Sequence, residues 1–399
     1  MSSFPRRLAR ADRVQLAVVA LAFATSVGES AFIPVLPAIR DAFGLSGMQA
    51  GALLSAETLA MLAAAVPVGM LSGRIGSRRL LLACAVLLPV SMLGHAVATG
   101  PALLLLARAA FGLSFGILWT IGPTLAAGGG RGAAGMGRLI AASGAGWLVG
   151  PAFAGVVADA WGFRVPFFVI AALTVPLALV LALDRSSAPL VPAGRLRDAV
   201  AATRRHRAVG GVTLASAMLG VVTGVSGLIP PLVLAANGLS AGAIGAVVAL
   251  SAVVWIVGGA VSARLPSAQI DLRLVGSAVA VLAVAWLIPV FSLSTTAIIG
   301  FLLLSAACRA LLGTIIYALA RLAVPAEELA APIVGVMNVA WAAMALAAPL
   351  AAGLAVGGPG VRWAFVATAA AGFAVAGWML LWRRDTVRAV PLRVRGSQA

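Results

Sequence analysis

The sequence has little charge and little cysteine. Only 10% of its 399 residues are charged, and lysine is absent. A soluble globular protein carries about 25% charged residues, so this composition excludes an ordinary soluble domain. The two cysteines, Cys84 and Cys308, both lie in apolar runs. A disulfide framework or a zinc site needs more cysteines or closer spacing. We therefore expect both to be inert core residues, with no metal and no cofactor.

The chain also lacks the sequence features of an enzyme. None of its polar segments is long enough for a soluble domain, and there is no metal-spaced His/Cys cluster, phosphate-binding loop or nucleophile triad. A membrane enzyme or receptor is therefore the weakest hypothesis, and we expect no enzymatic activity.

Every basic residue is an arginine, and the net charge is +17. In a soluble protein such an excess would suggest nucleic-acid binding. Here the arginines stand mostly between apolar runs, which is the pattern that orients a membrane protein. We therefore expect no nucleic-acid partner, and a lipid bilayer around most of the chain.

Apolar runs make up most of the sequence, which is 62% hydrophobic with a mean hydropathy of +1.10. Runs of about 20 residues span a bilayer as helices, whereas strands of a membrane barrel would alternate with a period of two. The first run follows a basic start, but it continues to about Ala38 and is too long for a signal peptide. The sequence predicts an all-α membrane protein with twelve transmembrane helices, at roughly 14–38, 47–71, 79–98, 101–126, 135–158, 163–183, 209–236, 240–263, 272–292, 295–320, 329–354 and 360–382.

The predicted spans form two halves of six. The longest polar segment, 184–208, reads as a linker between an N-terminal bundle (1–183) and a C-terminal bundle with a tail (209–399). Two such parallel repeats imply a pseudo-twofold axis along the membrane normal and a binding cavity between the halves. The evidence for the repeat is a set of residues that recur at a constant offset of 198: Pro151, Gly155, Gly162, Arg164 and Phe167 match Pro349, Gly353, Gly360, Arg362 and Phe365.

The arginines also predict the topology. Of the 28, Arg40, Arg164 and Arg362 lie in loops on one side, and Arg108 and Arg309 lie within spans. The other 23 (28 − 3 − 2) lie at the termini or in loops on the opposite side, which is the cytoplasmic side by the positive-inside rule. Both termini and the linker are therefore expected in the cytoplasm. The arginine-only, alanine-rich composition favours a high-GC bacterial gene, and hence the bacterial inner (cell) membrane.

The six-plus-six arrangement resembles the major facilitator superfamily over essentially the whole chain. "IPVLP", ending at Pro37, is similar to the proline pair in the first span of the twelve-span drug:proton antiporters. Arg108, followed by Gly112 and Gly116, resembles that group's fourth-span motif, which is linked to proton transfer; Phe111 stands where glutamine is common. The resemblance implies alternating access, with the two halves rocking around a central cavity.

The segment after the second span, "GMLSGRIGSRRLL", resembles the superfamily's loop signature. In the family an aspartate of this motif helps to lock the cytoplasmic side, and here Gly73 replaces it. The resemblance thus implies a lock that is weakened or relocated. Independently of any family, a glycine turn with three arginines fixes the inner end of the helix hairpin. The matching motif residues are Gly69, Leu71, Arg74, Gly76 and Arg78.

The fifth span has the spacing of the antiporter motif of drug:proton exporters, and it is the most specific signal in the chain. Ala154 departs from the pattern, which usually has glycine there. Small residues allow close helix contact and a proline bends the helix, so the alternative is a generic glycine-rich packing face. The motif residues are Gly137, Gly146, Gly150, Pro151 and Gly155.

Three ionisable residues, Glu29, Glu57 and Arg108, lie at similar predicted depths in the N-terminal half. Charged groups inside a membrane are costly and usually functional. Two carboxylates and one arginine cannot all be charged and paired in low dielectric, so we expect one ionised carboxylate and one that holds a proton conditionally. The alternative for Glu29 is a static ion pair or a helix–helix hydrogen bond. For Glu57 it is a position that faces the partner half or lipid, and for Arg108 it is a purely structural role. We favour Glu29 as the proton carrier, because first spans line the central cavity in this fold and second spans mostly do not.

Polar and aromatic residues at helical spacing predict the lining of the cavity. Amides are scarce in the spans, so this wall suits hydrophobic or amphipathic molecules better than sugars; core packing is the alternative for any one aromatic. The predicted lining residues are Thr25, Ser26, Phe111, Phe115, Trp119, Ser143, Trp147, Thr223, Ser226, Trp255, Arg309, Tyr317, Asn338 and Trp341.

The leading functional hypothesis is a monomeric, proton-coupled exporter of hydrophobic or amphipathic small molecules, energised by the proton gradient. The alternative is a proton-coupled uptake carrier or a uniporter for a small metabolite in the same fold. The sequence does not identify the substrate.

Overall fold

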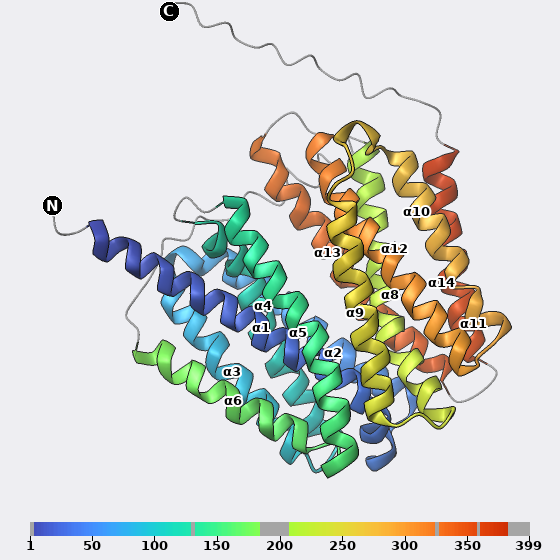
Figure 1. Cartoon of the computed structure of the whole chain (residues 1–399), viewed down its shortest axis with the longest axis horizontal. Helices are drawn as coiled ribbons and strands as arrows, with labels where there is room; N and C mark the ends of the chain where they lie inside the picture. Colours follow the sequence, from blue (N-terminus) through green and yellow to red (C-terminus); the bar gives the residue numbers. More distant parts are fainter. Residues whose placement is uncertain (1–3, 129–131, 184–206, 324–326, 357–359, 382–399) are drawn as a thin grey trace, which may run out of the picture.

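The computed structural model describes residues 4–128, 132–183, 207–323, 327–356 and 360–381. Every regular element in these ranges is a helix (Figure 1). Twelve helical segments are long and apolar enough to cross a membrane, which confirms the predicted number of spans and the all-α class. The predicted linker 184–208 and the C-terminal tail fall almost wholly outside the described residues, and the second half begins at Arg207.

Six candidate membrane spans lie in each half of the described chain. The N-terminal half comprises α1 (Phe4–Ala42), α2 (Gly47–Ile75), α3 (Ser77–Val97), α4 (Pro101–Ala127), α5 (Gly132–Trp161) and α6 (Val165–Leu183). The C-terminal half comprises α8 (Arg207–Ala236), α9 (Ala241–Ser262), the short 3₁₀ helix η1 (Ser267–Gln269), α10 (Leu272–Ala285), α11 (Ile288–Phe291), α12 (Thr295–Leu322), α13 (Glu327–Ala355) and α14 (Val361–Leu380).

The ninth span differs from the prediction because it is broken into α10 and α11. Pro289 lacks the N–H that would donate to the carbonyl of Ala285, where α10 ends. The indole of Trp286 fills the break and packs edge-on against the ring of Phe301, with 4.9 Å between centroids. A buried aromatic cluster therefore holds this interruption in place.

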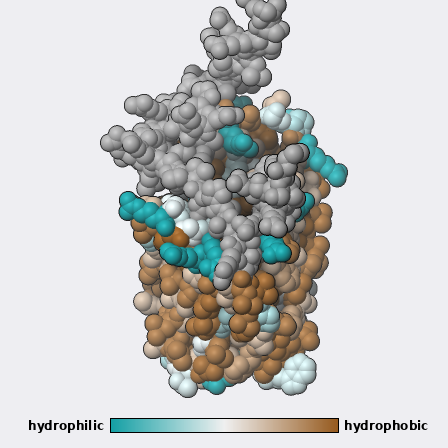
Figure 2. All heavy atoms as spheres, turned by 90° about the vertical axis from the view of Figure 1, so that its left-hand side faces the viewer, coloured by the Kyte–Doolittle hydropathy of each residue, from teal (hydrophilic) through white to brown (hydrophobic). Residues whose placement is uncertain are grey.

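The outer surface has the character of a membrane protein. Figure 2 shows apolar residues in a continuous belt on one face, with hydrophilic residues along its edges. Large apolar side chains are exposed on this protein, as with Leu106 at 67% and Leu173 at 70%. Exposure of this kind is expected where lipid, and not water, covers the surface.

The two ends of the molecule differ in how the halves meet. We call the end where α6 finishes at Leu183 and α8 starts at Arg207 the linker side, and the end where α1 finishes at Ala42 the far side. The halves converge at the far side and diverge toward the linker side (Figure 1). The helix backbones of the two halves approach each other most closely in the part of the molecule near the far side.

Two matching interfaces join the halves. Glycine has no Cβ, so the space that a Cβ would need shows how closely two helices approach. At the first interface, a Cβ placed on Gly155 of α5 would lie only 2.9 Å from the Cα of Gly242 in α9. In the other, a Cβ built on Gly353 of α13 would lie 2.8 Å from the Cα of Met48 in α2. Gly155 and Gly353 are one of the pairs that the 198-residue repeat relates. The repeat seen in the sequence therefore builds the two pseudo-symmetric contacts between the halves.

Among the described residues, only the first interface contains a charged side chain that hydrogen-bonds across the halves. The carboxylate of Asp159, near the end of α5, accepts hydrogen bonds from the hydroxyl of Ser240 (2.6 Å) and from the backbone N–H of Gly242 (2.9 Å). Ser240 caps the N-terminus of α9. A carboxylate from the N-terminal half thus lies at the positive end of a helix in the C-terminal half.

Candidate functional site

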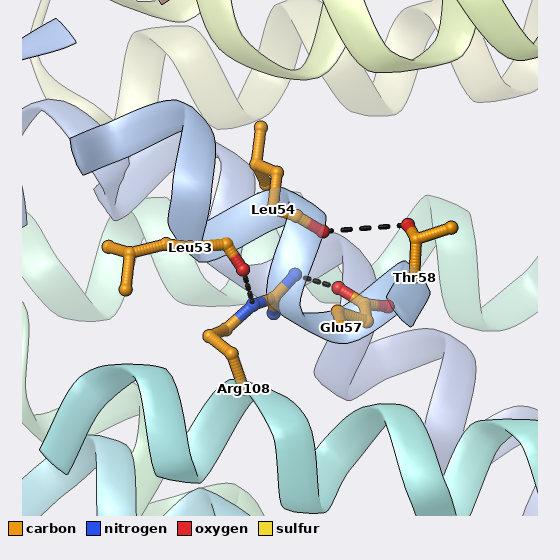
Figure 3. A network of polar contacts seen from close by, with 5 residues as sticks. All are labelled: Leu53, Leu54, Glu57, Thr58 and Arg108. Carbon is orange, nitrogen blue, oxygen red and sulfur yellow. Dashed lines mark hydrogen bonds and ion pairs between the residues drawn. The ribbon is translucent and has the colours of Figure 1, made fainter. Parts of the chain in front are cut away.

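The centre of the N-terminal half contains a buried ion pair between Arg108 of α4 and Glu57 of α2. Figure 3 shows the Arg108 side chain reaching across to α2, where its Nε also donates to the carbonyl of Leu53 at 3.3 Å. The two side chains are only 2% and 11% exposed. Two of the three charged groups expected at one depth are therefore in direct contact.

Two glycines allow α2 and α4 to approach closely enough for this ion pair. Gly112 and Gly116 lie four and eight residues after Arg108, on the same helix face. A Cβ at Gly112 would lie 2.9 Å from the Cα of Glu57, and one at Gly116 would lie 2.9 Å from the Cα of Met61. Larger residues would separate the helices, so the motif that the sequence suggested for α4 has a packing role next to its charged residue.

Arg108 has aromatic neighbours as well. Its guanidinium carbon lies 4.1 Å from the ring centroid of Phe32 and 5.6 Å from that of Phe111. Contacts of this kind stabilise a cation in a low-dielectric site. One guanidinium nitrogen, Nη1, is buried and has no hydrogen-bond partner among the described residues. Glu57 therefore does not use the full bonding capacity of Arg108.

Glu29, on α1, is the second carboxylate near Arg108. It interacts electrostatically with Arg108 and lies near the side chain of Trp147 on α5. The residue lies deep in the protein but is only half-buried, and its Oε2 has no hydrogen-bond partner within the described chain. Glu29 is thus near the cation without being its direct partner.

Helices α1 and α5 pack tightly beside Glu29. The hydroxyls of Ser26 and Ser143 are hydrogen-bonded at 2.8 Å, and Ser30 donates to the carbonyl of Gly146 at 3.3 Å. A Cβ at Gly146 would lie 2.7 Å from the Cβ of Ser26, and one at Gly150 would lie 2.6 Å from a carbonyl of α1. Two glycines of the fifth-span motif therefore fix α5 against α1, and both helices contribute to the surroundings of Glu29.

The other motif glycines have different surroundings. Gly155 joins α5 to α9, and the carbonyl of Pro151 faces Gly245 of α9. A Cβ at Gly137 would meet nothing within 4 Å. The fifth-span motif thus serves two helix interfaces, one within the N-terminal half and one between the halves.

The loop motif forms the turn that the sequence predicts. Gly76 has a φ of +85° between α2 and α3, a conformation that favours glycine. Arg78 donates to the carbonyl of Ala182 in α6 at 2.9 Å, whereas Arg74 is exposed. Gly69 lies near a side chain of α4. Gly73, at the position of the missing aspartate, is exposed, and a Cβ placed on it would meet no atom within 4 Å.

The predicted lining residues are not all accessible. Thr25, Ser26 and Phe111 are completely buried, so the prediction that they line an open cavity is wrong for this conformation. Thr25 donates back to carbonyls of its own helix, and Phe111 packs beside Gly28 of α1. Helical periodicity predicts which residues share a helix face, but neighbouring helices cover these parts of it.

The remaining lining residues are at least partly accessible. The half-buried residues among them are Phe115, Trp119, Ser143, Trp147, Thr223, Ser226, Arg309 and Trp341. The exposed ones are Trp255, Tyr317 and Asn338. The rings of Phe115 and Trp119 are 5.9 Å apart and form one aromatic run along α4. The indole nitrogen of Trp119 and the hydroxyl of Ser226 are buried without partners in the described chain. Tyr317 donates to the side chain of Asn338 at 3.0 Å.

Sequence reasoning missed two residues. Asp159 was not selected from the sequence, yet it bridges the halves. His95 was not selected either. It is 1% exposed, stacks on Phe167 at 5.1 Å and packs edge-on against Phe32. A serine that precedes a helix, as Ser240 does, signals the cap. No sequence pattern indicates that its partner comes from the other half.

Comparison with known proteins gives one family and one fold. Residues 18–331 match the family described as the Major Facilitator Superfamily. A search of curated proteins finds no significant match. The fold is similar to that of a bacterial homologue of the human lysosomal transporter Spinster, solved in an inward-facing, unoccupied conformation (TM-score 0.75, 16% identity, covering 93% of this chain and 96% of that one). The occupied, inward-facing form is similar as well (TM-score 0.74, 15% identity, 93% and 96%).

Proposed function

This chain belongs to the major facilitator superfamily, and from that premise we propose that it is a proton-coupled exporter of hydrophobic or amphipathic small molecules. Membership makes it a multi-pass membrane protein and a secondary transporter with a small-molecule substrate, and not an enzyme. The proton coupling, the direction of transport and the kind of substrate are our proposals. So are a monomeric state and a bacterial inner membrane with both termini in the cytoplasm.

The observation that carries the coupling proposal is the unequal pairing of the two carboxylates. Glu57 is in direct contact with Arg108, whereas Glu29 is half-buried and has one oxygen without a partner in the described chain. A carboxylate with incomplete bonding at such depth gains and loses a proton more readily than one held in an ion pair. We therefore assign the proton to Glu29, with Arg108 as the cation that stabilises its charged form.

The proposed substrate follows from the accessible side chains. Phe115 and Trp119 continue an aromatic run along α4 that starts at Phe111, which packs beside Gly28, the neighbour of Glu29 in the chain. Flat aromatic walls suit apolar bodies of varied shape. A substrate that enters between the halves would contact this wall and would change the surroundings of Glu29, so that proton exchange and substrate exchange are coupled.

The arrangement of the halves supports alternating access. Contacts at the far side hold that side closed, and the ribbons diverge at the linker side (Figure 1). If the linker side is cytoplasmic, as the arginine distribution predicts, this conformation is inward-facing. An exporter would load its substrate in this state, whereas an uptake carrier would release it.

The test is the variant Glu29→Gln in proteoliposomes with an imposed pH gradient. A panel of hydrophobic compounds is added, and proton movement is followed with an internal pH dye. We expect the wild type to exchange protons for at least one compound and Glu29→Gln to lose this exchange while eluting and unfolding like the wild type. Glu57→Gln is the matched control, and it should retain proton movement. Undiminished exchange in Glu29→Gln would remove Glu29 from the mechanism.

The same vesicles separate export from uptake. Reversing the pH gradient reverses the direction in which an antiporter accumulates the compound relative to the protons. Movement of compound and protons in the same direction would identify the uptake carrier, and compound movement without protons would identify a uniporter.

A further inference from the structure

Arg309, near the middle of the C-terminal half, has no counterion among the residues that the structure describes. It lies fourteen residues after Thr295 and thirteen before Leu322, the ends of α12. At 1.5 Å per residue this is about 20 Å from either end. The side chain is shorter than that distance and cannot reach the membrane surface, so it must be neutralised within the protein or by something that enters it.

No group in the described part of the chain neutralises this guanidinium. Arg309 makes neither an ion pair nor a hydrogen bond there, in contrast to Arg108 with its partners Glu57 and Leu53. The acidic residues of the C-terminal half are remote from Arg309 in sequence, and those that the structure describes lie at the ends of their helices. They are Asp271, which caps α10, Glu327 and Glu328 at the start of α13, and Asp385 in the tail.

The guanidinium of Arg309 is also open to a ligand. Protein atoms surround Arg309 on all sides at a larger distance, yet its side chain is only half-buried. Its guanidinium nitrogens keep some exposure to solvent. A group that is deep but accessible faces a concave space and not lipid. One turn further, a Cβ at Gly313 would meet nothing within 4 Å, so the space continues along this face.

The next turn of the same face presents polar groups. Tyr317, eight residues after Arg309, is 38% exposed, and its hydroxyl donates to the side chain of Asn338 on α13. Both side chains therefore keep hydrogen-bonding capacity beside the open stretch. Arg309, Gly313 and Tyr317 make a strip with a cation at one end and neutral polar groups at the other.

We propose that Arg309 binds the anionic group of the transported molecule, a carboxylate or a phosphate ester attached to an apolar body. An arginine fork matches both groups geometrically, and a substrate anion supplies the counterion that the described chain lacks. This inference rests on the proposed transport function and narrows its substrate class from hydrophobic or amphipathic molecules to amphipathic anions.

Equilibrium binding tests this without any transport. The purified full chain in phosphatidylcholine nanodiscs is titrated calorimetrically with 2-naphthoate, 2-naphthyl phosphate, neutral 2-naphthamide and cationic 2-naphthylmethylammonium. We expect at least one anion to bind roughly tenfold more tightly than the neutral amide, as for a charge-assisted hydrogen bond. The stronger of the two anions distinguishes a carboxylate from a phosphate substrate.

Variants assign the preference to the residue. Arg309→Gln should remove the preference for anions, and Arg309→Lys should keep part of it, because the charge remains while the fork is lost. Arg321→Gln, on the exposed last turn of α12, is the matched control and should leave the preference unchanged.

Three results would overturn the proposal: no anion preference in the wild type, an unchanged preference in Arg309→Gln, or loss of the preference in nanodiscs that contain phosphatidylglycerol. The third would show that Arg309 holds a lipid headgroup and not a substrate. Failure of proton coupling in Glu29→Gln liposomes would not alter these binding results, so the two proposals fail separately.

Discussion

The contact of Asp159 with the start of α9 should set the balance between conformations. Asp159 belongs to the N-terminal half, and its partners Ser240 and Gly242 belong to the C-terminal half. Opening the far side separates these groups, so the contact stabilises the closed state alone. The position that the repeat relates to Asp159 is Gly357 (159 + 198), which has no carboxylate. Gly357 lies outside the described residues, and by sequence the repeat supplies no equivalent carboxylate.

The size of the effect follows from the exposure of the contact. A carboxylate at a helix N-terminus contributes about 0.3–1 kcal/mol at exposed sites. The hydrogen bonds to Ser240 and Gly242 add to this, but solvent screens an exposed contact such as this one. We expect about 1 kcal/mol in total for Asp159→Asn, which changes the ratio of closed to open far sides about fivefold.

Spin-label distances measure this ratio. In a background without Cys84 and Cys308, labels are attached at Ala102 on α4 and Phe291 on α11, two exposed far-side positions in different halves. Asp159→Asn should shift population toward longer distances. Asp271→Asn is the matched control, since Asp271 is an exposed aspartate that caps α10 within its own half, at 2.8 Å from the backbone nitrogen of Leu274. Equal distance distributions for wild type and Asp159→Asn, or an equal shift in the control, would refute this reasoning.

Two further predictions concern the buried ion pair. Glu57→Ala leaves Arg108 buried without its partner and should destabilise the protein by about 3 kcal/mol, lowering the apparent melting temperature by several degrees; an unchanged melting temperature would contradict the pairing. Gly112→Ala places a Cβ against the backbone of Glu57 and should cost about 1–3 kcal/mol, whereas Gly73→Ala, with nothing within 4 Å, should cost little in the same thermal unfolding assay.

Much of the fold could be predicted because a membrane restricts the possible structures. Every backbone polar group must be satisfied within the bilayer, so an apolar run of sufficient length implies a helix. The sequence predicts the twelve helices and the family correctly. The break at Trp286 was missed, because one proline in an apolar run does not reveal whether the helix bends or stops.

The candidate site could be predicted only as a set of residues. Charge in an apolar run was sufficient to select Glu29, Glu57 and Arg108. Their pairing depends on how far α2 lies from α4, which Gly112 controls through contacts with another helix. Burial of Thr25 and Phe111 depends likewise on neighbours that helical periodicity does not contain.

The sequence by itself thus determined the class of protein, the number of spans, the internal repeat and the ionisable residues at membrane depth. These features follow from local composition and from the cost of placing charge in lipid. Only the tertiary structure decided which carboxylate pairs with Arg108, that Asp159 reaches the other half, and that Arg309 has no counterion among the described residues. Each of these depends on distances between helices far apart in the chain, and such distances are fixed by packing.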